Sequence, residues 1–209
     1  MAKYLEFEVS LVGTKPRAWR RFVLRRQHST FLDLHEAIQH ACGSEAKRPF
    51  RVIAAAPGAG DGFDWGVDPM TGEPEPEAHV VPLHQFFEEP KDAALYWYDF
   101  GDDWQHKVVL KKAFESKESF YRRLTGGALA FPMEDCGGLW GYYSCIAAVK
   151  PDFFKPEELA QFDPETLEER REWVPDDWDP TAFDLKAESQ RFDVNKVEYT
   201  WQLVRPPNT

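Results

Sequence analysis

The sequence predicts an α+β protein with a mixed or largely antiparallel sheet, which opens with a β-hairpin and a helix in a β-grasp-like order. Two stretches, 4–12 and 104–113, alternate apolar and polar residues, which is typical of half-buried strands. Residues 31–42 repeat apolar side chains with the spacing of an amphipathic helix. Beyond residue 150, acidic segments have proline at or near their first turn, where its missing N–H is not needed. The C-terminal part is therefore expected to be helical.

Local signals place the first hairpin and the helix that follows it. Residues 4–12 and 19–24 are expected to form strands on either side of a Gly-Thr-Lys-Pro turn. Thr30 and Asp33 have the spacing of a capping box, in which each side chain bonds the backbone of the other residue, so a helix is expected to begin there. Gly43 follows the last apolar position and is a natural stop for that helix.

The middle of the chain divides into a loop and a second hairpin. A third strand is expected at 50–55, and the glycines, prolines and acids of 57–82 predict a long mobile loop. The clearest hairpin of the chain joins 94–100 to 104–113 through Gly-Asp-Asp. After it, residues 116–124 are expected to form a short helix that leads into a glycine-rich connection.

The C-terminal part is expected to form an acidic helical annex over 151–192, followed by a last strand at 196–204 that rejoins the sheet. Residues 151–184 contain twelve acidic and three basic residues. We expect a single domain over 1–209, because the matched periodicities indicate one shared core. The residues expected in that core are Leu5, Phe7, Val9, Leu11, Ile38, Val108, Leu110 and Trp201.

Composition indicates the class of protein. No stretch contains the roughly 18 apolar residues that a membrane span needs, and the N-terminus lacks the apolar block of a signal peptide. We therefore expect a cytoplasmic protein with no membrane partner. The three cysteines include no C-x-x-C pair, which indicates reduced thiols and not a disulfide framework or a zinc ribbon. A formal net charge of −11 is unlike that of most nucleic-acid-binding proteins.

One short segment has the opposite charge. Residues 15–26 contain six basic residues and no acid. In one interpretation these side chains alternate between the two faces of a strand and neutralise the acidic segments. In the other they form a patch for an anion or a nucleic acid. The arginines of this candidate patch are Arg17, Arg20, Arg21, Arg25 and Arg26.

A second group of polar residues comes from the second hairpin, from the turn that precedes the predicted helix near residue 140, and from the first helix. Carboxylates and neutral imidazoles are ligands of divalent metals, for which Asp102, His106 and Asp135 are the candidates, and they also form general acid–base pairs. Their spacing matches no standard metal motif. The full candidate set is His35, Asp99, Asp102, His106, Glu134, Asp135 and Cys136.

Each of these residues also has a structural interpretation. Asp102 fits a hairpin turn, where aspartate side chains bond nearby backbone groups. His35 and His106 lie on apolar faces, which is typical of hydrogen-bonded core histidines. Acids at 134–135 would meet the positive end of a helix dipole. Cys136 would need a nearby cation or helix N-terminus to act as a nucleophile, and the adjacent acids oppose formation of the thiolate.

Several stretches together resemble a known family. They are, in this order, PRAWRRFVL, FLDLHEAIQHACG, YWYDFGDDWQHKVVL, PMEDCGGLWGYY and WDPTAFDLKAESQRF, and the resemblance runs over roughly residues 4–192. The chain is thereby similar to the plasmid pRiA4b ORF-3-like family, whose members also occur as passenger proteins of insertion elements. The resemblance implies an α+β fold but no particular reaction, ligand or cofactor. The chain departs from the family pattern at Lys47-Arg48-Pro49, where members often have a histidine, which weakens the case for a metal.

The sequence predicts a non-enzymatic binding or accessory module linked to mobile elements, with a protein or nucleic acid as its partner. No catalytic triad, phosphate loop or metal motif is complete in the sequence. The first alternative is a metal-dependent hydrolase that uses Asp102, His106, Glu134 and Asp135. The second is nucleic-acid binding through the arginine-rich strand at 15–26.

Overall fold

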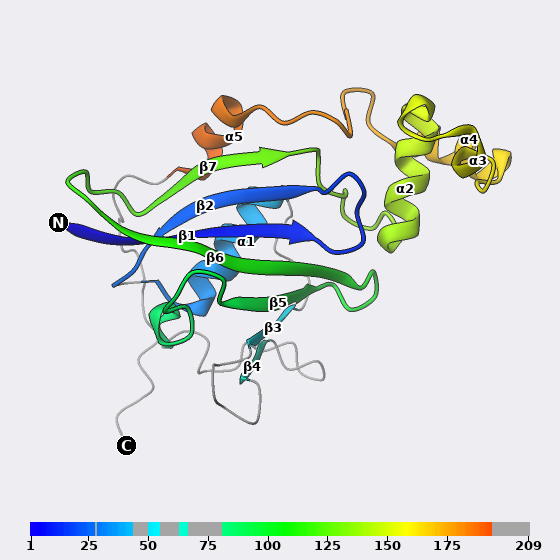
Figure 1. Ribbon diagram of the computed structural model, residues 1–209. Helices are drawn as coiled ribbons and strands as arrows, with labels where there is room; N and C mark the ends of the chain where they lie inside the picture. The colour runs from blue at the N-terminus through cyan, green and yellow to red at the C-terminus, as the bar shows by residue number, and fades with distance from the viewer. Residues whose placement is uncertain (28, 44–49, 55–62, 67–80, 194–209) are drawn as a thin grey trace, which may run out of the picture.

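The computed structural model describes residues 1–27, 29–43, 50–54, 63–66 and 81–193. Within these residues, seven strands form one antiparallel sheet, one helix lies against a face of the sheet, and a group of helices gathers at one end of it (Figure 1). The predicted α+β class is confirmed, with a largely antiparallel sheet opened by a hairpin and a helix.

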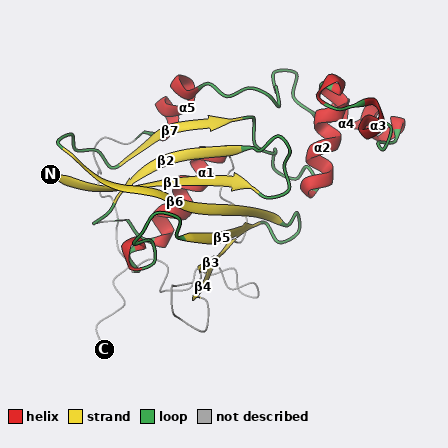
Figure 2. Ribbon diagram, viewed as in Figure 1, coloured by secondary structure: helices red, strands yellow, loops and turns green. Residues whose placement is uncertain are grey.

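The sheet has the strand order β4-β3-β5-β6-β1-β2-β7 (Figure 2). Its strands are β1 (Ala2–Leu11), β2 (Trp19–Arg25), β3 (Phe50–Ala54), β4 (Phe63–Gly66), β5 (Ala93–Tyr98), β6 (Trp104–Ser116) and β7 (Arg122–Ala128). The α-helices are α1 (Phe31–Cys42), α2 (Gly138–Val149), α3 (Pro156–Leu159), α4 (Pro164–Trp173) and α5 (Leu185–Phe192). Two 3₁₀ turns are η2 (Leu83–Gln85) and η3 (Pro151–Phe153).

Strand β1 joins the two predicted hairpins, because it pairs with β2 on one side and with β6 on the other. Its register places Phe7 opposite Phe22 of β2 and Leu110 of β6. Side chains of a strand alternate between the two faces of a sheet. The face that contains Phe7 is turned toward α1 and is called the inner face here. The opposite, outer face contains Glu6 and Glu8, and no described helix lies over β1, β2 and β6 on that side (Figure 1).

Helix α1 begins and ends where its capping signals predict. The Thr30 side chain accepts the Asp33 backbone N–H at 3.4 Å, and the Asp33 carboxylate accepts the Thr30 backbone N–H at 2.7 Å, which completes the capping box. Gly43 follows the helix with φ of 79°, a left-handed conformation that glycine adopts without steric strain.

The inner face and α1 enclose one hydrophobic core. Phe31, Leu34 and Ile38 of α1 have no exposed surface, because the helix turns its apolar stripe toward the sheet. The predicted core is confirmed for seven residues, namely Leu5, Phe7, Val9, Leu11, Ile38, Val108 and Leu110. The eighth, Trp201, lies with the predicted strand 196–204 outside the described residues.

The prediction of a short helix at 116–124 is wrong. Strand β6 extends beyond its predicted end, and after a turn the chain enters β7, which pairs with β2. Arg122 and Leu124 of β7 are both buried, at 9% and 5% exposure. The strand was hard to recognise because its first inward residue is an arginine. Gly127, expected in a connection, lies inside β7, where a Cβ would be 2.5 Å from the ring of Phe183.

The predicted loop and annex are described in part. Strand β4 lies within the segment 57–82 that was expected to be a mobile loop, and most of the rest of that segment is outside the described residues. The annex predicted over 151–192 contains η3, α3, α4 and α5. Helix α5 begins at Leu185, where the Asp184 side chain caps it by accepting the Lys186 and Ala187 backbone N–H groups. No helix in the described ranges is long and apolar enough to cross a membrane.

The capping box of α1 provides a test of this fold. The change Thr30→Ala should lower the free energy of unfolding by about 1 kcal/mol, because it removes the hydroxyl that accepts the Asp33 N–H. Thr30→Ser keeps the hydroxyl and should stay within about 0.5 kcal/mol of the native chain. Urea denaturation of the three proteins measures the difference. Equal losses for both variants would contradict the capping role.

Candidate functional site

The turn between β5 and β6 is built from aspartates in a left-handed conformation. Asp99 and Asp103 have φ of 49° and 56°, a region that aspartate enters more readily than most residues. Asp99 Oδ1 accepts the Gly101 backbone N–H at 3.1 Å, and the Asp103 backbone N–H donates to the Asp99 carbonyl oxygen at 2.8 Å. These bonds fix the turn that contains Asp102.

Asp102 connects this turn to the start of α2. Its Oδ2 accepts the Gly137 backbone N–H at 3.1 Å, and the N–H groups at a helix N-terminus are those the helix itself leaves unpaired. Gly138 follows with φ of 67°, and a Cβ there would lie 2.7 Å from the Asp102 carbonyl oxygen. Glycine allows that close approach because it has no side chain. The Gly-Gly pair therefore lets the hairpin turn contact α2.

A second link lies on the strand side of the turn. The Tyr98 hydroxyl donates to Glu134 Oε1 at 2.9 Å. Next to this bond is a hollow of about 10 Å³, about enough for one water molecule. His106 lines it, and the His106 Nδ1 is buried without a hydrogen-bond partner in the described part of the chain. The lining consists of Tyr98, Trp104, His106, Phe131, Pro132, Met133 and Glu134.

The two histidines of the candidate set are neutral core residues. Burial lowers the pKa of His106 and of His35 to about 4 in each case, because an apolar surrounding disfavours the charged ring. His35 Nδ1 lies 2.8 Å from the Tyr96 hydroxyl, which also accepts a hydrogen bond from Gln39 Nε2 at 2.6 Å. The His35 ring stacks on Phe50. His35 thus belongs to a separate polar group between α1 and β5.

The remaining candidates lie in the turn before α2. Asp135 is exposed and has φ of 59°. Cys136 has no exposed surface, and burial raises the pKa of its thiol, which disfavours the nucleophilic thiolate. Within the described ranges, no three or more His, Cys, Asp or Glu residues are arranged to hold a metal ion. Through the contacts of Asp102 and Glu134, the β5–β6 hairpin is bonded to the turn that precedes α2. We call these contacts the hairpin–turn junction.

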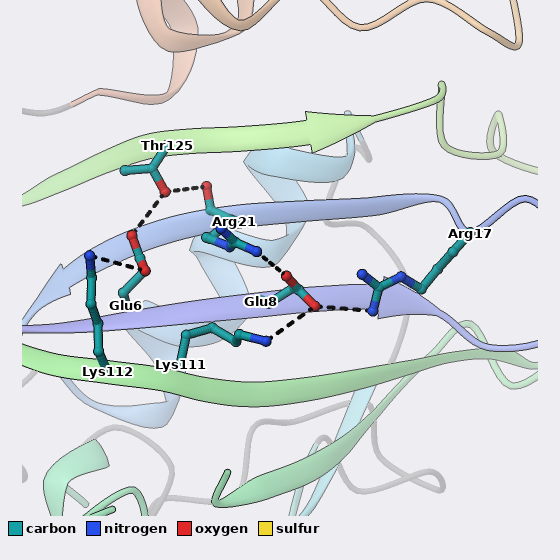
Figure 3. A network of polar contacts seen from close by, with 7 residues as sticks. All are labelled: Glu6, Glu8, Arg17, Arg21, Lys111, Lys112 and Thr125. Atoms are coloured by element: carbon teal, nitrogen blue, oxygen red, sulfur yellow. Dashed lines mark hydrogen bonds and ion pairs between the residues drawn. The ribbon is translucent and has the colours of Figure 1, made fainter. Parts of the chain in front are cut away.

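A different polar assembly lies on the outer face of the sheet (Figure 3). Glu8 of β1 has a side chain only 7% exposed, and its carboxylate accepts hydrogen bonds from Arg17 at 3.0 Å and Arg21 at 2.6 Å. The Lys111 ammonium lies 3.8 Å from the same carboxylate. One acid is therefore surrounded by three cations, which come from the β1–β2 loop, from β2 and from β6. This arrangement leaves an excess of positive charge.

Glu6 precedes Glu8 by two residues on the same face of β1 and has one cation beside it. Its carboxylate lies 3.6 Å from the Lys112 ammonium and accepts a hydrogen bond from the Thr125 hydroxyl at 3.4 Å (Figure 3). Strands β6 and β7 thus both contribute to the outer-face network. We use this name for the side chains drawn together in Figure 3, namely Glu6, Glu8, Arg17, Arg21, Lys111, Lys112 and Thr125.

The ionisation of Glu8 follows from these contacts. Burial by itself would raise the pKa of the Glu8 carboxyl. The hydrogen bond from Arg21 and the charges of Arg17 and Lys111 outweigh burial, and they hold this pKa below its ordinary value. Glu8 is therefore a carboxylate at neutral pH and orders the cations around it.

The structure divides the arginine segment between the two faces of the sheet. Arg17 and Arg21 lie on the outer face, and their guanidinium groups lie 5.9 Å and 5.2 Å from the ring centroid of Trp19. Arg20 points inward and is 5% exposed. Its Nε donates to the Ala41 carbonyl oxygen at 2.9 Å. Arg20 therefore ties β2 to the end of α1 and does not belong to an outer patch.

Arg25 and Arg26 lie at the far end of this segment. Both are partly exposed, and the Arg25 Nε is buried without a hydrogen-bond partner within the described ranges. Arg26 borders a hollow together with Lys3 and Phe114. Neither arginine is part of the outer-face network drawn in Figure 3.

Sequence reasoning missed the contribution of β6 to the outer face. Lys107 and Lys111 alternate with the buried residues of β6, which places them on its outer side. That alternation is visible in the sequence. The pairing of β6 with β1, which brings Lys111 to Glu8, is not visible there, because no local pattern specifies which strands are neighbours.

The hairpin–turn junction can be tested by removing its charged acceptor. Asp102→Ala should lower the free energy of unfolding by about 1 kcal/mol, because the exposed Gly137 N–H exchanges its carboxylate acceptor for water. Asp103→Asn removes the same charge at the next, exposed position and should change stability by less than about 0.5 kcal/mol. Thermal and urea denaturation measure both values. A loss from Asp102→Ala no larger than that of the control would rule out a stabilising role of the hairpin–turn junction.

The buried histidines make stability depend on pH. Their folded pKa is about 4 and their unfolded value is near 6.5, so the unfolded chain binds more protons between these limits. Stability should therefore fall as the pH drops from 6.5 to 4, by up to about 1.4 kcal/mol per pH unit for each histidine. His106→Gln should flatten the curve in this window. Denaturation curves that run parallel for the native and variant chains would contradict the assignment.

Comparison with known proteins agrees with the fold and indicates no activity. Residues 3–187 match the model of the family described as "Plasmid pRiA4b ORF-3-like protein". The "Uncharacterized protein y4hQ" of Sinorhizobium fredii is 28% identical over 159 residues, which cover 72% of this chain and 76% of that protein.

A solved structure is also similar. The crystal structure of "Protein of Unknown Function MM3350 from Methanosarcina mazei Go1" shares 32% identity, with a TM-score of 0.72, and the match covers 90% of this chain and 98% of that one. The sequence motifs that resemble the family fall within the matched residues, except for the last five residues of WDPTAFDLKAESQRF. The chain belongs to the plasmid pRiA4b ORF-3-like family.

Proposed function

We propose that this protein is a non-enzymatic binding module whose outer sheet face binds a single-stranded nucleic acid. The observation that carries the proposal is the excess of cations around Glu8, where Arg17, Arg21 and Lys111 share one carboxylate. The two acids of the network cannot neutralise the surrounding cations. The basic residues of this part of the outer face are Arg17, Arg21, Lys107, Lys111 and Lys112.

The exposure of these groups makes them accessible to a ligand. The side chains of Arg17 and Lys112 are 53% and 57% exposed, whereas that of Glu8 is 7% exposed. An approaching anion therefore meets the cations first. Charges further away than about 8 Å are largely screened at physiological ionic strength, so this local excess acts despite the net charge of −11.

The geometry favours a single strand over a duplex. Neighbouring strands lie about 4.8 Å apart, so β2 and β6 present two rows of cations on either side of β1. Single strands bind to such flat, basic sheet faces, with phosphates on the cations and bases against aromatic rings. Arg17 and Arg21 can each hold a phosphate by two parallel hydrogen bonds, and Trp19 lies between them on the same face.

The family link with insertion elements is consistent with a nucleic-acid ligand.

We further assign the whole of 1–209 to a single domain with a helical annex at 151–192, because one core includes residues from β1 through to Phe192 of α5. The protein would act in the cytoplasm, where its three unpaired thiols remain reduced.

Removing outer-face cations tests the proposal. The triple variant Arg17→Gln, Lys107→Gln, Lys111→Gln should bind a fluorescein-labelled 20-nucleotide oligothymidine or oligouridine about tenfold or more weakly than the native chain, because up to three phosphate contacts are lost. The slope of log affinity against log salt should fall in magnitude by up to about 2, since each contact with a single strand contributes about 0.7. Fluorescence anisotropy at several salt concentrations measures both quantities.

Matched controls separate a local site from general attraction. The variant Lys155→Gln, Lys186→Gln, Arg191→Gln removes the same charge from exposed positions outside the sheet and should bind as the native chain does. Glu8→Gln should bind more tightly although it is less stable, because it removes the acid that offsets the cations. Equal weakening in both triple variants, or binding that does not depend on salt, would overturn the proposal.

A further inference from the structure

The large apolar side chains that remain exposed concentrate at one end of the molecule. Seven are found among the described residues, and four of them lie on α2 and α4. Trp140 is 58% exposed and Trp173 is 44% exposed. Scattered exposed apolar residues are normal on a protein surface, but a concentration of them marks an interaction site. The four are Leu139, Trp140, Val149 and Trp173. Val149 follows Trp140 by nine residues and so lies on the opposite side of α2. We call the exposed side of α4, together with Leu139, Trp140 and Trp173, the α2–α4 surface.

Helix α4 contains no buried residue along its length, although helices of globular proteins normally bury one face. Two contacts nevertheless fix the position of α4. The Arg171 guanidinium donates to the Ala148 carbonyl oxygen of α2 at 2.9 Å and 3.1 Å. Val174, directly after α4, is 4% exposed and belongs to the main core. The α2–α4 surface is therefore held in position by these contacts, and much of it is not covered by other described residues.

The charge on this surface is strongly negative. Residues 151–184 have twelve acids against three bases, and two of those bases already have partners. Arg171 bonds α2, and Arg170 lies over the Trp173 ring at 5.6 Å. The acids of α3, α4 and the segment after it are exposed to solvent. They are Glu157, Glu158, Glu165, Glu168, Glu169, Glu172, Asp176 and Asp177.

A hollow of about 570 Å³ lies where α2 and α4 end. Its lining includes three carboxylates, Asp152, Asp176 and Asp179, and two cations, Lys150 and Arg171. Lys150 pairs with Asp179 at 3.3 Å, and Arg171 donates to the Ala148 carbonyl oxygen near the end of α2. The charges that border the hollow are therefore largely compensated, and the exposed acids of α3 and α4 provide the negative field of this surface.

We propose that the α2–α4 surface is a docking site for a basic, amphipathic segment of a partner protein, rich in lysine and arginine with interspersed leucine-like residues. The exposed tryptophan and aliphatic side chains supply the apolar contact, and the surrounding carboxylates select the charge of the partner. This site is separate from the outer sheet face and does not depend on the nucleic-acid proposal.

The experiment uses the full chain and two labelled synthetic peptides of equal length and charge. One peptide combines lysine and arginine with leucine, and the other combines the same cations with serine. The leucine peptide should bind at least about tenfold more tightly than the serine peptide, as measured by fluorescence anisotropy. Equal binding of the two would mean that only the net charge of the protein attracts them, and that outcome overturns the proposal.

Variants locate the site. Glu169→Gln, Glu172→Gln, Asp176→Asn together, and Trp173→Ala alone, should each weaken binding of the leucine peptide about fivefold or more. The matched variant Glu88→Gln, Glu89→Gln, Asp103→Asn removes three exposed acids elsewhere and should bind as the native chain does. Circular dichroism checks that each variant is folded. Weakening by the matched variant equal to that of the site variants would overturn the proposal.

A second copy of this chain is the competing occupant, because its basic outer face could also meet the acidic annex. Sedimentation velocity over a range of concentrations distinguishes the two cases. The docking proposal expects a monomer whose behaviour is unchanged by Arg17→Gln and Lys111→Gln. Self-association that disappears in this double variant would show that the surface is an interface between copies, and it would overturn the proposal for a separate partner.

Discussion

The neutralisation of Glu8 on β1, an interior strand of the sheet, is the interaction on which the outer face depends. Strand β1 pairs on both sides, so its outward carboxylate is only 7% exposed and must find cations within the sheet. It takes them from the β1–β2 loop, from β2 and from β6. One buried acid thus brings three basic side chains from distant parts of the sequence together, and it sets both the stability and the charge of that face.

Local patterns in the sequence predicted much of the fold. The alternation in β1 and β6 identified their inward residues, and Thr30, Asp33 and Gly43 marked the ends of α1. Strand β7 was missed because a buried arginine, Arg122, stands where an apolar residue would normally reveal a strand; its Nε donates to the Phe192 carbonyl oxygen at 2.8 Å. A hydrogen bond across 70 positions of sequence leaves no local signal.

Less of the candidate site than of the fold could be predicted, because its contacts also join residues that are distant in the sequence. The Gly-Asp-Asp turn and the glycines before α2 were recognisable as turn elements, but their contact through Asp102 and Gly137 depends on the sheet that positions them. Arg20 and Arg21 are adjacent in sequence and point to opposite faces, so the basic segment could not be assigned to one surface without the strand that contains it. The protonation of His35 and His106 likewise follows from burial, which composition does not reveal.

Among the described residues, the positive charge of the outer sheet face is separated from the negative charge of the annex, and this separation contributes an electric dipole. Cations gather on the outer face of β1, β2 and β6, and the acids of α3 and α4 gather at the end of the sheet where α2 lies (Figure 1). In the field of a polyanion such a body experiences a torque as well as a force, and it turns its basic face forward before contact. Fewer collisions are then wasted on wrong orientations, and this alignment weakens as added salt shortens the range of the field.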